Sequence, residues 1–190
     1  MKLLYILLAL IFLSCKKENQ DKTTPLDKKE IKVLNNDSIS ITIPNSWEII
    51  KDSSFIFSGI ISQSKKEEQF ILLNNKIKNI SIKSYLLEDL RIATDNNEID
   101  SLDYFIHKYY LENNDYCYIL ETFPTENVGV FSFVREYNGN IYDLTFKSYK
   151  VKKGKQDNNQ FYQVLFSFTI NGQKMFPIDS IPVIIGKEYL

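Results

Sequence analysis

Glycine, proline, histidine and cysteine are all scarce in this 190-residue chain, which has six glycines, five prolines, one histidine and two cysteines. The low glycine and proline content excludes collagen-like and low-complexity proteins. A glycine-rich phosphate loop is excluded as well, because Gly129, Gly139, Gly154 and Gly172 are isolated from one another. One histidine and a cysteine or two do not supply the usual ligands of a zinc site, so we expect no metal and no cofactor.

An excess of basic charge is also lacking. The chain has 23 Lys and Arg residues against 24 Asp and Glu residues, which gives a net charge of -1. Without a basic excess there is little to neutralise phosphates, so nucleic acid is not an expected partner. Hydrophobic residues make up 44% of the chain and aromatic residues 14%, enough for one domain with a sizeable core.

The N-terminus has an apolar run that is too short to cross a membrane. Leu3 to Leu13 carries no charge, and roughly 11 residues span about 16 Å as a helix, half of a bilayer core. The run therefore fits an export signal. The following "FLSC", Phe12 to Cys15, resembles a bacterial lipobox. The resemblance implies a lipoprotein signal peptide over residues 1–14 and a lipidated, palmitate-carrying Cys15; the alternative is a buried core cysteine.

The residues after Cys15 indicate where in the cell the protein is located. Lys16 to Glu18 resembles the lysine-plus-acid export signals of surface lipoproteins in Bacteroidota, although charged residues also suit an ordinary solvated tether. We expect the chain to be held on the membrane through Cys15, at the outer membrane, on its periplasmic face or at the cell surface. Residues 15–37 are polar and contain Pro25, which predicts a flexible tether.

A globular domain is predicted over residues 38–171, beginning with strands. "SISITIP", residues 38–44, alternates Ile39, Ile41 and Ile43 on one face, as a half-buried strand does. Two further strands are predicted over residues 54–61 and 69–74. The apolar period then changes to that of a helix over residues 81–94, with Ser81 as its N-cap.

The second half of the domain has two predicted hairpins and a helix. Residues 103–111 and 115–123 form the first hairpin, and residues 128–137 and 140–151 flank the Asn138-Gly139 pair, a strong turn signal. Along the last strand Tyr142, Leu144 and Phe146 are expected to share one face. Residues 160–168 have a helical apolar face, and residues 172–190 are predicted to be a C-terminal tail.

This order predicts an α+β fold, with a mainly antiparallel β-sheet and helices packed on it. The segments "ISITIPNSWEI", "SIKSYLLEDL" and "YDLTFKSYKV", followed by "FYQVLFSF", resemble the opening strand, first helix and closing strand and helix of the PsbP/Mog1/DcrB-like superfamily. The resemblance implies an α/β/α sandwich. It also implies a non-catalytic binding scaffold, since members include a photosystem accessory subunit, a small-GTPase binder, bacterial lipoproteins and a secretion-effector adaptor.

No catalytic constellation is expected. The sole histidine, His107, lies within a predicted strand, where a sheet-face or partly buried role is favoured over a general base. Cys117 is favoured as a buried apolar thiol over a nucleophile. Glu88 and Asp89 are neighbours that point different ways on a helix, which does not support a glycosidase pair.

Two surface features remain open. The tyrosines of the first hairpin are candidates for an exposed partner-binding patch, with ordinary core packing as the alternative: Tyr104, Tyr109, Tyr110, Tyr116 and Tyr118. The tripeptides "DSI", "DSL" and "DSI" resemble the O-glycan acceptor of exported Bacteroidota proteins, with chance occurrence as the alternative. Their serines are Ser38, Ser101 and Ser180.

The sequence therefore predicts a non-enzymatic, membrane-anchored envelope lipoprotein that binds or assists another envelope protein. A first alternative is an immunity or adaptor protein that binds a secreted toxin. A second alternative is an envelope hydrolase that uses His107 or Cys117, and it requires one of them to line a pocket beside carboxylates.

Overall fold

A computed structural model describes residues 31–60, 69–75, 80–95, 103–111, 114–125, 128–148, 159–186 and 189–190. These residues form two helices and twelve strands within the described ranges. The elements are β1 (Ile31–Asn36), β2 (Ile39–Pro44), β3 (Glu48–Ile50), β4 (Phe57–Ile60), β5 (Gln69–Asn75), α2 (Ile82–Asp95), β6 (Asp103–Tyr110), β7 (Tyr116–Thr125), β8 (Val128–Tyr137), β9 (Asn140–Ser148), α3 (Asn159–Ser167), β10 (Thr169–Ile170), β11 (Gln173–Lys174) and β12 (Val183–Ile185).

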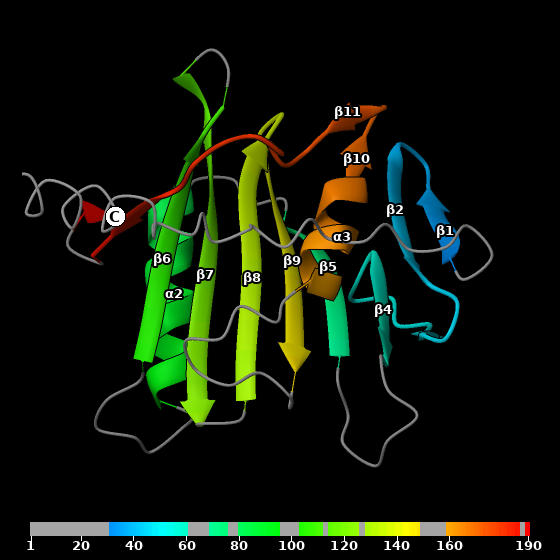
Figure 1. Cartoon of the computed structure of the whole chain (residues 1–190), viewed down its shortest axis with the longest axis horizontal. Coiled ribbons are helices and arrows are strands. Elements are labelled where there is room, and N and C mark those ends of the chain that lie inside the picture. Colours follow the sequence, from blue (N-terminus) through cyan, green and yellow to red (C-terminus); the bar gives the residue numbers. More distant parts are fainter. Residues whose placement is uncertain are drawn as a thin grey trace, which may run out of the picture.

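The strands form one large and one small antiparallel sheet. The eight-stranded sheet has the order β12-β6-β7-β8-β9-β5-β4-β3, and the four-stranded sheet has the order β1-β2-β10-β11. Figure 1 shows the long strands β6 to β9 side by side, with α3 in front of the large sheet and α2 behind it. The prediction of an α+β fold with a mainly antiparallel sheet and helices packed on it is confirmed.

The larger core lies on the α3 face of the eight-stranded sheet. Ile41 and Ile43 of β2, which are fully buried, pack there with α3 and with the inward side chains of β7, β8 and β9. The predicted alternation of Ile39, Ile41 and Ile43 is confirmed, as is the shared face of Tyr142, Leu144 and Phe146, all of which belong to this core. An extensive set of aromatic contacts follows, including Phe131 against Phe161 at 5.8 Å between ring centroids.

A second, smaller core lies between α2 and the opposite face of the sheet. Ile82, Leu86 and Leu90 of α2 are buried there against residues of β6, β7, β8 and β9. The helix begins where the sequence predicts, because the hydroxyl oxygen of Ser81 accepts a hydrogen bond from the main-chain N–H of Ser84 at 3.2 Å. The N-cap prediction is confirmed.

Both predicted hairpins are present. β6 pairs with β7 and β8 pairs with β9, both antiparallel. Asn138 has a φ of 51° and Gly139 a φ of 72°, which is the left-handed pair that a two-residue turn requires. These two hairpins form the centre of the large sheet and determine where the ends of β6, β7 and β8 meet.

Two predicted boundaries are wrong. Residues 31–36, assigned to the tether, form β1, which pairs with β2 along its whole length. Hydrogen bonds to β2 hold this segment as a strand, although its sequence shows no clear alternation of apolar and polar residues. Residues 172–190, assigned to a tail, include Met175 and Phe176, both buried in the larger core, and β12, which pairs with β6. The folded unit therefore begins earlier and ends later than predicted. No helix among the described residues is long and apolar enough to span a membrane.

Candidate functional site

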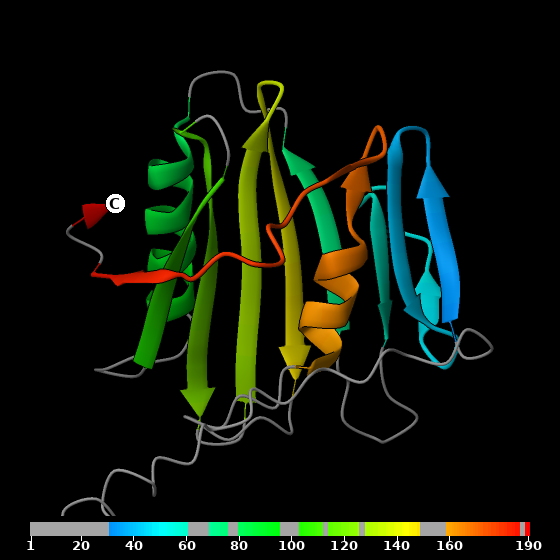
Figure 2. The ribbon, with the colours of Figure 1, turned by 45° about the horizontal axis from the view of Figure 1, so that its top comes forward.

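The candidate site is an open cavity where the C-terminal segment crosses the end of the large sheet. Figure 2 shows this segment (red) passing from β11 in front of β9, β8 and β7 to β6. The cavity beneath it has a volume of about 730 Å³, within the usual range of ligand sites. Its walls come from the β6–β7 and β8–β9 hairpins, the β10–β11 hairpin and the crossing segment. The lining residues are Tyr110, Leu111, Asp115, Arg135, Tyr137, Gln173, Lys174, Phe176, Pro177, Ile178, Asp179 and Ser180.

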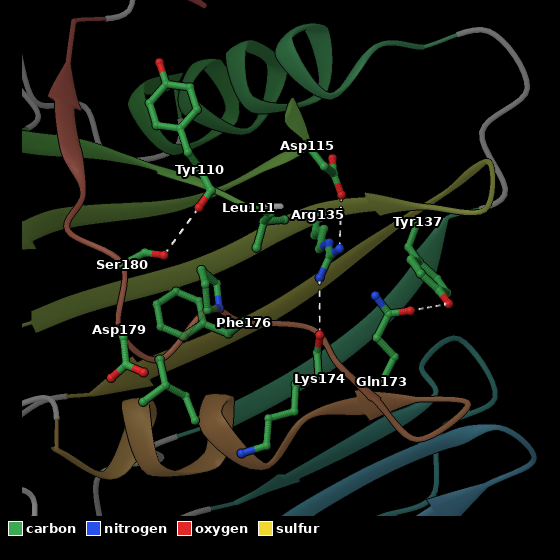
Figure 3. A pocket seen from close by; sticks show the side chains of 12 residues that line it. Tyr110, Leu111, Asp115, Arg135, Tyr137, Gln173, Lys174, Phe176, Asp179 and Ser180 are labelled. Atoms are coloured by element: carbon green, nitrogen blue, oxygen red, sulfur yellow. Dashed lines mark hydrogen bonds and ion pairs between the residues drawn. The ribbon is translucent and has the colours of Figure 1, made fainter. Parts of the chain in front are cut away.

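Arg135 of β8 occupies the deepest part of this arrangement and is 5% exposed. Its Nη1 donates to the main-chain oxygen of Met175 at 2.7 Å, and its Nη2 donates to Oδ2 of Asp115 at 3.0 Å. Figure 3 shows the guanidinium between Asp115 and the segment at Lys174. The positive charge is paired with a carboxylate and with a carbonyl oxygen, so the floor of the cavity has no net charge. The Nε of Arg135 is buried and has no hydrogen-bond partner among the described residues.

The outer walls combine aromatic and polar groups. The Tyr137 hydroxyl donates to Oε1 of Gln173 at 3.0 Å, and the Ser180 hydroxyl donates to the main-chain oxygen of Tyr110 at 3.3 Å. In Figure 3 the Tyr110 ring points away from Arg135, so its contribution to the lining is the backbone. Apolar area from Phe176 and Pro177 lies next to these hydrogen-bonding groups. Such a surface suits recognition of a segment that is itself partly apolar and partly polar.

His107 and Cys117 do not line this cavity. Both lie on the α3 face of the sheet; His107 is 9% exposed and Cys117 is fully buried. Burial raises the pKa of the Cys117 thiol to about 12, against the smaller lowering effect of the Arg135 charge. The thiolate is therefore scarce at neutral pH, as the predicted buried thiol requires. The prediction that His107 is a sheet-face residue is confirmed.

His107 does have a carboxylate neighbour. Its Nε2 lies 3.5 Å from Oε1 of Glu121, on the adjacent strand β7. Both atoms are buried and have no hydrogen-bond partner among the described residues. The pair lies on the α3 face of the sheet and does not line the cavity. The pocket beside carboxylates that the hydrolase alternative requires is therefore not formed at this cavity by His107 or Cys117.

The predicted tyrosine patch is divided by the fold. Tyr109 is buried in the larger core and Tyr118 in the smaller one, so these two are wrong as members of an exposed patch. Tyr104 and Tyr116 are half-buried and Tyr110 is exposed. Alternation along the strands is the reason, since neighbouring tyrosines point to opposite faces and each face has its own core. On the α2 face, the ammonium group of Lys108 lies 4.3 Å from the centroid of the Tyr116 ring and contributes a cation–π contact.

Two of the four predicted modification sites, Cys15 and Ser101, lie outside the described residues. Ser38 is exposed in the turn between β1 and β2, and Ser180 is half-buried at the cavity rim. The structure does not test whether these residues are modified.

A buried carboxylate network on the α2 face was missed by sequence reasoning. Asp143 of β9 is 3% exposed, and its Oδ2 accepts a hydrogen bond from the Tyr85 hydroxyl at 2.6 Å. Its Oδ1 accepts one from Thr145 at 2.8 Å. Burial, and secondly the Asp143 charge, raise the pKa of Asp89 to about 6. Asp89 lies one helical turn after Tyr85, so it shares the helix face that contacts the sheet.

No family model and no curated protein matches the chain. A solved structure does match: the solution structure of cyanobacterial PsbP (CyanoP) from Synechocystis sp. PCC 6803. The TM-score is 0.56 at 10% sequence identity, over 77% of this chain and 96% of that chain. The fold is PsbP-like. At this identity the similarity establishes the PsbP-like fold and leaves function to be argued from the site.

Proposed function

We propose that this chain is a membrane-anchored accessory protein of the bacterial envelope, and that its PsbP-like domain binds another envelope protein. The observation that carries the proposal is the cavity of about 730 Å³ under the C-terminal segment. It is open, chemically mixed and built at the ends of the long strands β6, β7 and β8, and regular strands are precise supports for a recognition site. The accessory role is in keeping with the PsbP-like fold.

The charges of the cavity favour binding over catalysis. Arg135 and Asp115 are engaged with each other, at 3.0 Å. Lys174 and Asp179 are opposite in sign, so the described lining has no excess of either charge. A protein segment of low net charge, with an apolar or aromatic side chain at its centre, would fit this lining better than an anion would.

The proposed location at the membrane rests on the N-terminal sequence. Lipidation of Cys15 would tie the domain to the membrane with more than one acyl chain, which is enough for stable attachment. The placement that we propose is the outer membrane, on either face. An immunity or adaptor protein for a secreted toxin would use the same cavity, and the two proposals differ only in the identity of the partner.

Site-specific photo-cross-linking in cells tests the binding proposal. The full chain would carry a photo-reactive residue at Gln173, in the exposed cavity wall, or at Val33, which is 54% exposed on β1. We expect an adduct with one envelope protein from position 173 and none from position 33. Equal adducts at both positions, or none at position 173, would contradict the proposal, and mass spectrometry of the adduct separates an envelope partner from a toxin.

A further inference from the structure

An apolar surface lies along the β6–β12 edge of the large sheet, apart from the cavity floor. We call it the apolar edge and define it as five exposed side chains of β6, β12 and the residues before β12. Ile181 is 88% exposed and Ile184 is 64% exposed, so neither packs on its own domain to any large extent. The members are Phe105, Tyr110, Ile181, Val183 and Ile184.

The strand at this edge has one side without a partner. β12 pairs antiparallel with β6 on its inner side, and it is the last strand in the order of the large sheet. No described strand pairs with its outer side. Sheet edges are commonly protected by charged side chains, particularly lysine, or by proline. Pro182 precedes β12, but β12 itself contains neither a charged residue nor a proline. Between residues 177 and 186 the single charged residue is Asp179, and β12 itself is Val-Ile-Ile.

Both faces of β12 are apolar. Val183 lies opposite Lys108, on the α2 side, and Ile184 lies opposite His107, on the α3 side. A rigid partner laid on one face of the sheet would cover only one of these side chains. An additional strand continuing the sheet brings side chains to both faces at once, and it also satisfies the free backbone groups.

The exposed area is of the size that an interface between two copies needs. From the exposed fractions, the five side chains present on the order of 500 Å² of apolar surface. A standard interface buries about 800 Å² per partner, of which roughly 56–65%, or about 450–520 Å², is apolar. Backbone and rim atoms of the edge add to that area. A strand that is apolar on both faces and almost uncharged is also complementary to itself, because antiparallel pairing across a two-fold axis brings no like charges of β12 together.

We propose that two copies of this chain associate through the apolar edge, β12 against β12, and so form a continuous sixteen-stranded antiparallel sheet. The pairing is isologous, with Ile181 and Ile184 of each copy covered by the other. Figures 1 and 2 show β1 (blue), in the four-stranded sheet, on the opposite side of the domain from β12 (red). The first described strand therefore lies far from the proposed contact. This inference does not depend on what occupies the cavity.

Sedimentation of the full chain, purified in detergent, tests the pairing. We expect a dimer at micromolar concentration, and we expect Ile184→Lys to weaken association at least tenfold because it places a charge at the centre of the contact. Val33→Lys, a matched change at an exposed apolar residue of β1, should leave the dimer unchanged. Circular dichroism verifies that both variants are folded. A wild-type monomer at tens of micromolar would overturn the proposal, and so would an Ile184→Lys variant that dimerises like the wild type.

A cross-link gives an independent test that needs no purified dimer. Ile184→Cys in the full chain should join to itself through a short bis-maleimide, giving a product of twice the chain mass. All of these chains carry Cys15→Ser, so that Cys117 is the one native thiol left. Val33→Cys should not join to itself, and the parent chain should not because Cys117 is fully buried. A product joining Ile184→Cys to a different protein would show that the edge has another occupant and would overturn self-association.

Discussion

The Arg135 guanidinium donates a hydrogen bond to the main-chain oxygen of Met175, 2.7 Å away and 40 residues later in the chain. This contact joins the centre of the large sheet to the start of the C-terminal segment. Met175 is itself fully buried in the larger core. The segment that follows forms one wall of the cavity and then becomes β12, so a single buried side chain supports both proposed binding surfaces.

Replacing Arg135 by methionine should destabilise the domain by about 2–3 kcal/mol, because a buried main-chain acceptor loses a charged donor. The ion pair with Asp115 adds little, since the Asp115 side chain is 45% exposed. Denaturant unfolding of the full chain measures the change. Arg91→Met is the matched control: Arg91 is exposed and paired with Glu88 on the surface of α2. Arg91→Met should shift the denaturant midpoint of unfolding only slightly. An equal loss of unfolding free energy in both variants would contradict the assigned role of Arg135.

Asp89 should make the domain less stable as the pH rises. Its pKa is about 6 in the fold and 3.8 as a free side chain, so between these values the folded state holds a proton that the unfolded state has lost. Stability therefore falls as the pH increases from about 4 to 6 and stays lower above that range. At pH 7, Asp89→Asn should be about 1–3 kcal/mol more stable than the wild type, and near pH 4 the difference should largely disappear.

Glu88 provides the control for this titration. It neighbours Asp89 in sequence, but it is exposed and its pKa is lowered by its hydrogen bond with Arg91. Glu88→Gln should not raise stability at pH 7. The free energy of unfolding of Asp89→Asn, relative to the wild type, should change between pH 4 and pH 7. A constant difference would contradict the raised pKa of Asp89 that follows from its burial and from the Asp143 charge.

Cys117 should be unreactive in the folded protein. With its pKa at about 12, the thiolate is roughly one part in 10⁵ at pH 7, and the side chain is fully buried. In a Cys15→Ser chain, where Cys117 is the one remaining thiol, a maleimide should label it only after denaturation, as followed by mass spectrometry of the intact chain. Rapid labelling under native conditions would show a reactive thiol and would revive the nucleophile alternative.

Features that depend on neighbouring residues were predictable from the sequence. The alternation of Ile39, Ile41 and Ile43 and the Ser81 cap are determined within a few residues, and so they were found. The positive φ values of Asn138 and Gly139 are likewise a local preference of those two residue types.

Features that depend on distant residues were not predictable. β1 forms because β2 pairs with it, and its own sequence shows no clear period. Met175 and Phe176 follow a turn and precede two prolines, and this local pattern indicates a tail. In the structure both side chains are buried in the larger core. The Tyr85–Asp143 hydrogen bond joins residues 58 apart. The tyrosines of β6 and β7 were visible in the sequence, but which of them would be buried depended on both faces of the sheet being covered.

The central claim is that this PsbP-like domain acts at a membrane to which Cys15 attaches it. Metabolic labelling with a radioactive or clickable palmitate, followed by membrane fractionation, tests it on the full chain and on Cys15→Ser. We predict a labelled wild type in the outer-membrane fraction and an unlabelled Cys15→Ser chain that leaves that fraction. An unlabelled wild type, or a Cys15→Ser chain that stays in the outer membrane and takes up the same label, would contradict the account.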